Sequence, residues 1–256
     1  MNILHTIILG VVEGITEFLP ISSTGHLILS AKILGIQNSE FLKTFEIFIQ
    51  LGAICSVIFL YWRRIMKNIG LAKKIAVAFL PTAVLGLAAY PFIKRYLLNN
   101  APVVLWSLFL GGIAIYLLEK YFEGKKGGTV KLEEMTYQQA VLVGLAQSVA
   151  LIPGVSRAAT TILGGMFIGL DRKSIVEFSF MLAIPTMAAA SGLDLVQSAS
   201  SFNTTEFLML AVGFFVSFVV ALAAVKWLLR YIETHNFISF GIYRIVVAVL
   251  FWMLVI

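Results

Sequence analysis

The stretch ITEFLPISSTGHL, residues 15–27, decides how this chain is arranged, because it places polar groups inside an otherwise apolar segment. Residues 3–35 are apolar enough to enter a membrane but too long for one crossing, which takes about 20 residues. Pro20 and the small polar residues after it cannot continue a helix, but they can begin a new one. The sequence therefore predicts two helices separated by a break at PISSTG (20–25), covered by protein or facing a wet cavity.

A second apolar segment, residues 137–170, is also too long for one crossing and is broken at PGVSR (153–157). The chain around the two breaks is similar in sequence. Two pairs of segments align at an offset of about 133 residues, the first after one deletion: ILGVVEGITEFLP (8–20) with LVGLAQSVALIP (142–153), and FEIFIQLGAI (45–54) with FSFMLAIPTM (178–187). The common offset and the matched breaks predict an internal duplication.

The composition is that of a membrane protein. The chain has 256 residues, of which 60% are hydrophobic and 12% charged, whereas soluble domains carry about 25% charged residues. Mean hydropathy is +0.96. Six further stretches are long and apolar enough to cross a bilayer: roughly 44–62, 74–93, 102–119, 174–196, 206–229 and 238–256. We expect an all-α polytopic membrane protein of one domain, with the lone Cys55 excluding an internal disulfide framework.

The basic residues predict the orientation. If each half consists of one broken hairpin and three spans, the second half enters the membrane in the opposite orientation to the first. Such an arrangement is an inverted-topology repeat. Repeat one then covers about 1–120, a linker about 121–136 and repeat two about 137–256. One face collects Arg63, Arg64, Lys67, Lys73, Lys74, the linker, Arg172, Lys173 and Arg230; the other keeps mainly Lys32, Lys43, Lys94 and Arg95. The positive-inside rule makes the first face, with its linker, cytoplasmic and places both termini outside.

The net charge of +6 does not indicate nucleic acid, since the basic residues are scattered among apolar spans. Nor does the N-terminus read as a signal peptide, because Glu13 and Glu17 stand where an apolar region would be needed. These two acids are four residues apart and share one helix face. Their hard oxygens suit Mg²⁺ or Ca²⁺. The alternative is that both lie near water and are simply solvated.

Three hydroxyl residues, Ser22, Ser23 and Thr24, follow Pro20 where a helix N-cap belongs. Capping needs only one hydroxyl, and a helix N-terminus is also a site for anions. His26 lies three residues after Ser23, so the sequence predicts that both point the same way and form a nucleophile and its base. The alternative is a structural histidine.

The second break contains Arg157, the only basic residue between Lys131 and Arg172. Unless this arginine snorkels to the interface, it needs an anionic partner, and its planar fork suits phosphate oxygens. Gly154 would let the backbone approach that group. Further hydroxyl donors come from Ser156, Thr160 and Thr161. Two acids, two helix N-termini, an arginine and a Ser/His pair together predict phosphoryl chemistry, which depends on positioning and charge neutralisation.

In EGITEFLPISSTGH (13–26) and PGVSRAATT (153–161) the chain closely resembles the undecaprenyl-diphosphate phosphatases, the bacitracin-resistance membrane phosphatases of bacteria. The resemblance extends over essentially the whole length. It departs at Ala158, where the family motif has a serine. The other membrane lipid phosphatases, of the PAP2 type, also need a K-x6-RP segment and a second histidine after the serine-arginine. The only histidine after Arg157 is the distant His235, so that family is excluded.

The resemblance implies six spanning helices plus two re-entrant helical hairpins in an inverted repeat. It also implies hydrolysis of undecaprenyl diphosphate to undecaprenyl phosphate, the lipid carrier of cell-wall synthesis, in the bacterial inner (plasma) membrane. The active site would face the periplasmic or outer side and need a divalent cation, Mg²⁺ or Ca²⁺. A homodimer is compatible with the sequence.

The expected site has three parts. Ser23 attacks the terminal phosphorus while His26 takes its proton, with Glu17 and Arg157 as the other catalytic residues. Metal binding falls to Glu13 and Glu17. Substrate binding falls to Ser22, Thr24, Gly25, Gly154, Ser156, Arg157, Thr160 and Thr161. Attack by His26 itself or by water stays open. The alternative function is a polyprenyl-phosphate flippase or an ion-coupled transporter, since such carriers use the same inverted repeats and broken helices.

Overall fold

The computed structural model describes residues 1–97, 100–123, 128–197 and 203–255. Within these ranges the regular elements are helical, apart from one isolated bridge between Val130 and Leu170. The elements in chain order are α1 (Ile3–Thr16), α2 (Ser23–Ile33), α3 (Glu40–Lys67), α4 (Ile69–Phe92), η1 (Ile93–Leu97), α5 (Ala101–Phe122), α6 (Tyr137–Ser148), η2 (Val149–Leu151), α7 (Arg157–Phe167), α8 (Arg172–Gln197), α9 (Thr204–Tyr231) and α10 (Ile238–Val255). The predicted all-α fold is confirmed. Residues 124–127 of the predicted linker, and Ile256 in the last predicted span, lie outside the described residues.

Five of the described helices are long and apolar enough to cross a membrane: α3, α4, α5, α9 and the Arg172–Gly192 part of α8. They correspond to five of the six predicted spans. The sixth, at 238–256, corresponds to α10, whose stretch Ile238–Met253 is apolar but shorter. Large apolar side chains cover the outside of these helices; Leu87 is 69% exposed and Phe215 65%. Such a surface suits lipid and not water, so the chain is a polytopic membrane protein.

Both predicted breaks are present, and both have the same local geometry. α2 begins after Ser22 and α7 after Ser156, and these are the only non-glycine residues with a positive φ (72° and 77°) in the described part of the chain. Each serine hydroxyl accepts a hydrogen bond from the backbone N–H three residues on, at Gly25 (3.4 Å) and Ala159 (3.2 Å). At each break, a serine with positive φ ends the preceding segment, and the side chain of this serine caps the helix that follows.

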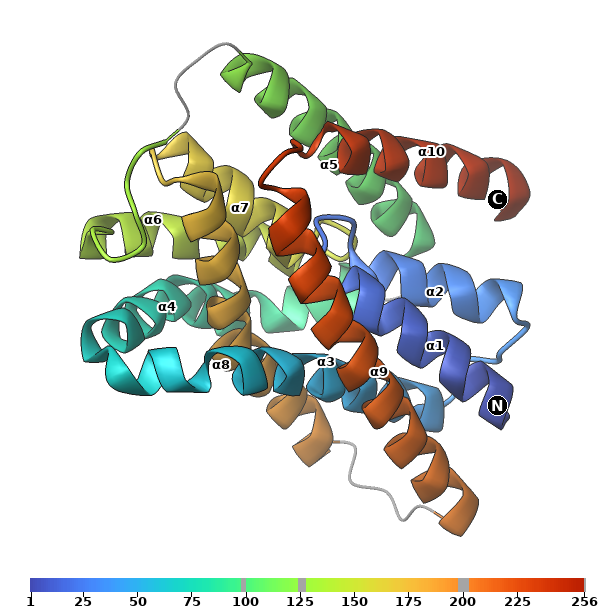
Figure 1. The fold of residues 1–256 in the computed structure, drawn as a ribbon. Coiled ribbons are helices and arrows are strands. Elements are labelled where there is room, and N and C mark those ends of the chain that lie inside the picture. The colour runs from blue at the N-terminus through green and yellow to red at the C-terminus, as the bar shows by residue number, and fades with distance from the viewer. Residues whose placement is uncertain (98–99, 124–127, 198–202, 256) are drawn as a thin grey trace.

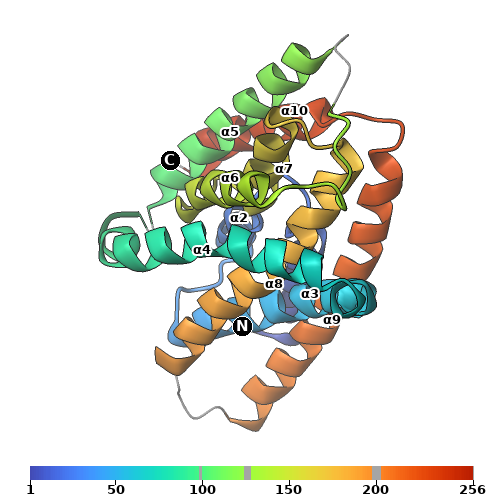
Figure 2. The ribbon, with the colours of Figure 1, turned by 90° about the vertical axis from the view of Figure 1, so that its left-hand side faces the viewer.

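The packing of the helices repeats as well. α1, which precedes the first break, packs along α9, and α6, which precedes the second break, packs along α4. α3 packs on α8, and α5 on α10, so each pair joins an element of the first half to one of the second. Figures 1 and 2 show the two broken segments, α1–α2 and α6–α7, entering from different sides so that their breaks meet near the centre of the molecule. The two halves thus build one site between them.

The basic residues predicted to share a face are linked by contacts at one end of the bundle. Arg64, at the end of α3, forms ion pairs with Glu133 of the linker (2.8 Å) and Glu177 of α8 (2.5 Å). The hydrogen bond from Arg64 holds the pKa of the Glu133 carboxyl below its usual range. Lys173 pairs with Glu233 beyond the end of α9 at 2.9 Å. On the opposite predicted face, the side chain of Lys94 lies outside the described residues.

Gly52 lets α3 approach α9 closely, and we expect its replacement by alanine to destabilise the protein. A Cβ atom at Gly52 would meet the carbonyl oxygen of Phe214 well inside contact distance. Overpacking of this kind costs about 1–3 kcal/mol, which lowers the Tm of a chain of this size by roughly 2–12 °C. Thermal unfolding in detergent measures the effect. Gly192→Ala is the control, since a Cβ there meets nothing within 4 Å, and equal Tm values for the two variants would contradict the expectation.

Candidate active site

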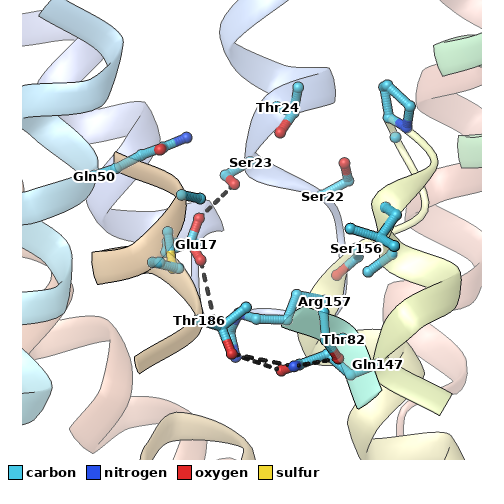
Figure 3. Close-up of a pocket in the computed structure, with 16 residues that line it drawn as sticks. Glu17, Ser22, Ser23, Thr24, Gln50, Thr82, Gln147, Ser156, Arg157 and Thr186 are labelled. Atoms are coloured by element: carbon cyan, nitrogen blue, oxygen red, sulfur yellow. Dashed lines mark hydrogen bonds and ion pairs between the residues drawn. The ribbon is translucent and has the colours of Figure 1, made fainter. Parts of the chain in front are cut away.

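A polar cavity of about 250 Å³ lies where the two breaks meet. Figure 3 shows its polar side chains converging from α1–α2, α3, α4, α6–α7 and α8. The lining residues are Glu17, Ser22, Ser23, Thr24, Gln50, Thr82, Gln147, Ala150, Leu151, Pro153, Gly154, Ser156, Arg157, Thr186, Met187 and Ala190. The structure therefore brings together the predicted carboxylate, hydroxyls and arginine from segments about 130 residues apart in the sequence.

An ion pair joins the two halves of the site. Arg157 Nη2 donates to Glu17 Oε1 at 3.1 Å, and the two side chains are only 10% and 5% exposed. Arg157 Nη1 donates to the carbonyl oxygen of Ser179 at 2.9 Å, which fixes the guanidinium plane. Its Nε is buried and has no hydrogen-bond partner among the described residues. In the structure the anionic partner of Arg157 is a carboxylate of the first break, and the N–H of Nε remains without an acceptor.

The hydroxyl of Ser23 donates to Glu17 Oε2 at 2.6 Å. Glu17 therefore touches both Ser23 and Arg157 (Figure 3). The sequence predicted that His26 would be the base beside Ser23, but in the structure the hydroxyl of Ser23 contacts Glu17 and not His26. The imidazole turns back instead, with Nδ1 2.8 Å from the carbonyl oxygen of Ser22 and Nε2 2.8 Å from Tyr243 Oη.

The surroundings of His26 explain the difference. Its ring stacks on that of Tyr243 with 5.5 Å between the centroids. It lines a separate, mostly apolar groove with Trp227 and Phe240 on the far side of the first break. Helical spacing placed His26 on the same turn as Ser23, but the N-cap carbonyl and the phenol on α10 decide where the ring points. In this structure a carboxylate, and not an imidazole, is positioned to take the proton of Ser23.

Glu13 is fully buried, and both of its carboxylate oxygens lack a hydrogen-bond donor in the described structure. A buried carboxylate without a donor needs either a proton or a cation. No group of three His, Cys, Asp or Glu side chains comes together within the described ranges. Mg²⁺ is often bound through one or two carboxylates plus substrate phosphates, so Glu13 with the neighbouring Glu17 fits such an ion in the presence of a phosphate ligand.

The backbone at both breaks is arranged for an anion. The N-termini of α2 and α7 open at the cavity, where their free N–H groups and helix dipoles favour negative charge. Gly154 has a φ of 89°, and a Cβ atom there would lie 2.7 Å from the carbonyl oxygen of Val104. Gly25 packs against Leu108, where a Cβ would meet Cδ1 at 3.1 Å, and does not line the cavity.

Two predicted substrate-binding hydroxyls support the site from outside the cavity. Thr160 Oγ1 donates to the carbonyl oxygen of Arg157 at 3.0 Å and lines an apolar groove between α5 and α6–α7. Thr161 Oγ1 hydrogen-bonds Ser179 Oγ at 2.6 Å. Both hydroxyls thus support the turn that carries Arg157, and phosphate binding by either residue stays a prediction. Ala158, the departure from the family motif, is fully buried.

Sequence reasoning missed one wall of the cavity. Gln147 is 1% exposed, and its Nε2 donates to Thr82 Oγ1 at 2.9 Å and to Thr186 Oγ1 at 3.1 Å. The signal was present, because the alignment of the two halves places Gln147 at the position of Glu13. The duplicated position carries a carboxylate in one half and a neutral amide in the other, so the two halves of the site are chemically distinct.

Comparison with known proteins shows the family of this chain. The model of the bacitracin resistance protein BacA family matches residues 6–250. The chain belongs to the BacA family. It is 48% identical over 253 residues, 99% of each chain, to the undecaprenyl-diphosphatase of Sulfurihydrogenibium sp.. It is 48% identical to that of Aquifex aeolicus over 96% of each chain, and 42% identical to that of Persephonella marina over 100% of each.

In this BacA-family chain the cavity can bind a phosphate group and offer it a nucleophile. Two helix N-termini and Arg157 supply positive potential, and the hydroxyl of Ser23 is already hydrogen-bonded to a carboxylate. A nucleophile within hydrogen-bond reach of its base, which is in turn oriented by a third group, is the usual arrangement of an activated hydroxyl. Here the third group is Arg157.

Proposed function

We propose that this BacA-family chain is a membrane phosphatase that hydrolyses undecaprenyl diphosphate to undecaprenyl phosphate and inorganic phosphate. This reaction recycles the lipid carrier of cell-wall synthesis. The observation that carries the proposal is the chain of contacts from Arg157 through Glu17 to Ser23, which spans the two helix N-termini in one cavity. A carrier needs a binding site for phosphate but has no use for a hydroxyl held against a base.

The geometry supports a two-step reaction. Arg157 and the N-termini of α2 and α7 bind the diphosphate. Ser23 Oγ attacks the terminal phosphorus as its proton passes to Glu17 Oε2, and the bond to the bridging oxygen breaks to release undecaprenyl phosphate. Glu17 passes this proton to the leaving undecaprenyl phosphate and becomes a carboxylate again. Water then attacks the phosphoserine as Glu17 takes one of its protons. The bond from phosphorus to Ser23 Oγ breaks, inorganic phosphate is released, and the proton passes from Glu17 to Oγ to restore the hydroxyl. A divalent cation held by Glu13 and Glu17 would neutralise phosphate charge.

Two other nucleophiles were compatible with the sequence, His26 and water. Both nitrogens of His26 are engaged by Ser22 and Tyr243, which favours a role in holding the first break over direct attack. A catalytic role of His26 stays a prediction. Trapping of radioactive phosphate separates the three cases: label on Ser23 supports the proposed step, label on His26 reverses it, and no covalent label indicates water.

The test of the function is phosphate release from a polyprenyl diphosphate by the purified protein in detergent micelles with Mg²⁺ or Ca²⁺. Micelles have no second compartment, so transport cannot produce a signal. Turnover there supports the phosphatase. Failure to release phosphate with any divalent cation, together with lipid movement in vesicles, would instead support the flippase or ion-coupled transporter.

We expect divalent-metal binding to depend on Glu13, because its buried carboxylate lacks a donor. Glu13→Gln should weaken binding of Mn²⁺, used as a spectroscopic probe for Mg²⁺, by at least about tenfold. Electron paramagnetic resonance of free Mn²⁺ measures this without reference to activity. Chelation should abolish phosphate release by the parent, and added Mg²⁺ should restore it. Glu40→Gln is the control, since Glu40 is exposed and pairs with Lys43; equal weakening in both variants would count against a metal site at Glu13.

We also infer six spanning helices and two re-entrant hairpins, α1–α2 and α6–α7, in an inverted-topology repeat of the inner membrane. The matched caps at Ser22 and Ser156 and the paired packing of α1 on α9 and α6 on α4 support this arrangement.

The contiguous basic end would then be cytoplasmic and the site would open to the periplasmic side. Labelling of a cysteine placed at Lys131, in a Cys55→Ser background, tests the orientation with a membrane-impermeant maleimide. A homodimer stays a prediction, which light scattering of the purified protein tests.

A further inference from the structure

Arg244 is the largest fully buried side chain among the described residues, with 0% exposure in the middle of α10. It forms no ion pair with any acidic residue that the structure describes. A buried guanidinium without a carboxylate is expensive unless every N–H finds an acceptor. The surroundings of Arg244 therefore show what the residue is for.

All five N–H groups of Arg244 donate to backbone carbonyl oxygens. Nη1 donates to Pro20 (3.1 Å) and Val155 (3.0 Å), and Nη2 to Gly154 (3.1 Å). The remaining two bonds run to α5, from Nη2 to Ser107 (2.9 Å) and from Nε to Leu108 (3.2 Å). No donor is left over for a ligand, so Arg244 does not bind substrate through a free N–H.

The acceptors lie at equivalent places in the two halves of the site. The carbonyl of Pro20 is two residues before the N-cap Ser22, and those of Gly154 and Val155 are one or two residues before the N-cap Ser156. One guanidinium thus holds the turn before α2 and the turn before α7 at a fixed separation. The same two turns carry the residues that meet in the cavity.

Neighbouring glycines make room for this side chain. A Cβ atom at Gly111 of α5 would overlap the guanidinium group of Arg244, and one at Gly112 would approach Arg244 Cβ at 3.1 Å. α5 therefore approaches α10 closely enough for its carbonyls to reach the guanidinium. Filling the space at Gly111 is a second, independent way to disturb the same contacts.

We propose that Arg244 is a positioning residue, which fixes the first break to the second so that Glu17 and Ser23 meet Arg157 in the geometry of the reaction. The proposal rests on the proposed function for its kinetic consequence, but not for its structural one. The five carbonyl oxygens require the planar fork of the Arg244 guanidinium, and not its charge alone. Lysine has the charge but only three N–H donors on a single nitrogen.

The kinetic test compares Arg244→Lys and Arg244→Gln with the parent in the micelle assay. Both variants should lose about ten- to a hundredfold in kcat, because misplaced reacting groups are costly, with KM changed by less than about threefold. The control is Arg230→Gln, an exposed arginine on α9 that should leave both constants unchanged. A raised KM at unchanged kcat would overturn the proposal in favour of direct substrate binding, and a lower Tm with unchanged kcat would reduce Arg244 to a stabilising residue.

The structural test needs no activity. Spin labels at Ile33→Cys and Phe167→Cys, on exposed positions near the ends of α2 and α7, report the relative placement of the two short helices in a Cys55→Ser background. Double electron–electron resonance should give a narrow distance distribution in the parent and a broader one in Arg244→Lys, while Arg230→Gln stays narrow. An unchanged distribution in Arg244→Lys would overturn the proposal.

If the Arg244 variants do not fold, Gly111→Ala still tests the proposal. This variant leaves Arg244 in place, but the added Cβ atom overlaps its guanidinium group. It should lower kcat and broaden the distance distribution in the same way, and parent-like values for both would contradict the proposal. If the parent releases no phosphate, the proposed function fails, and the spin-label result decides the role of Arg244 alone.

Discussion

Replacing Arg157 with alanine is expected to lower phosphate release about 10³-fold, because two separate contributions are lost. The guanidinium offers phosphate oxygens the N–H groups that it does not donate to Glu17 and Ser179, and it also holds Glu17 at 3.1 Å in position to meet Ser23. Without it, a buried carboxylate is left with no cation. The measurement is kcat/KM for a polyprenyl diphosphate in micelles.

Arg157→Lys is the more informative variant. A lysine ammonium cannot contact Glu17 and the carbonyl of Ser179 in the fork geometry of arginine. We expect the charge alone to recover less than about a tenth of parent activity. Arg230→Ala serves as the control for loss of a basic residue outside the site. Activity of Arg157→Lys close to that of the parent would show that charge suffices and that the fork has no role.

Glu17→Gln is expected to lower kcat about 10²- to 10⁴-fold with little change in KM. The amide has the size of the carboxylate, and its single oxygen can still accept from Arg157, but the NH2 group that faces Ser23 cannot take a proton. The loss would then measure the base together with the negative charge that Glu17 offers a divalent cation, and not a collapse of the site. Thermal unfolding of the variant checks that the fold is intact.

The double variant Glu17→Gln/Ser23→Ala decides whether the two residues act as one unit. If Glu17 serves only to activate Ser23, the double variant should be no less active than Ser23→Ala alone, since residues of one unit are not additive. Losses that multiply would show independent roles. Substantial activity in Ser23→Ala would exclude Ser23 as the nucleophile and indicate water.

The elements of the fold could be predicted from residue types and their spacing. Length and apolarity are enough to place helices in a membrane, because a chain there must satisfy its own backbone hydrogen bonds. Pro20 and Pro153 mark both breaks, and the repeated offset relates them before any contact is known. The same reasoning drew Glu17, Ser23 and Arg157 into one site, because charges at membrane depth need partners.

The orientation of single side chains could not be predicted in this way. Spacing placed His26 beside Ser23, yet its ring is held by the carbonyl of Ser22 and by Tyr243, which is 217 residues further along the chain. The sequence around Arg244 did not indicate its role, because the residue belongs to no motif. Its partners are backbone carbonyl oxygens, which every residue type carries and which therefore leave no pattern in the sequence.

By itself, the sequence determined that this is a helical membrane protein with two related breaks, one carrying carboxylates and hydroxyls and the other an arginine. Periodicity, proline and charge act locally, so they can be read along the chain. Only the tertiary structure decided that Glu17 lies between Ser23 and Arg157, that His26 faces away, and that Arg244 joins the two turns. These outcomes depend on which distant groups compete for each donor, and that competition exists only once the two halves are packed together.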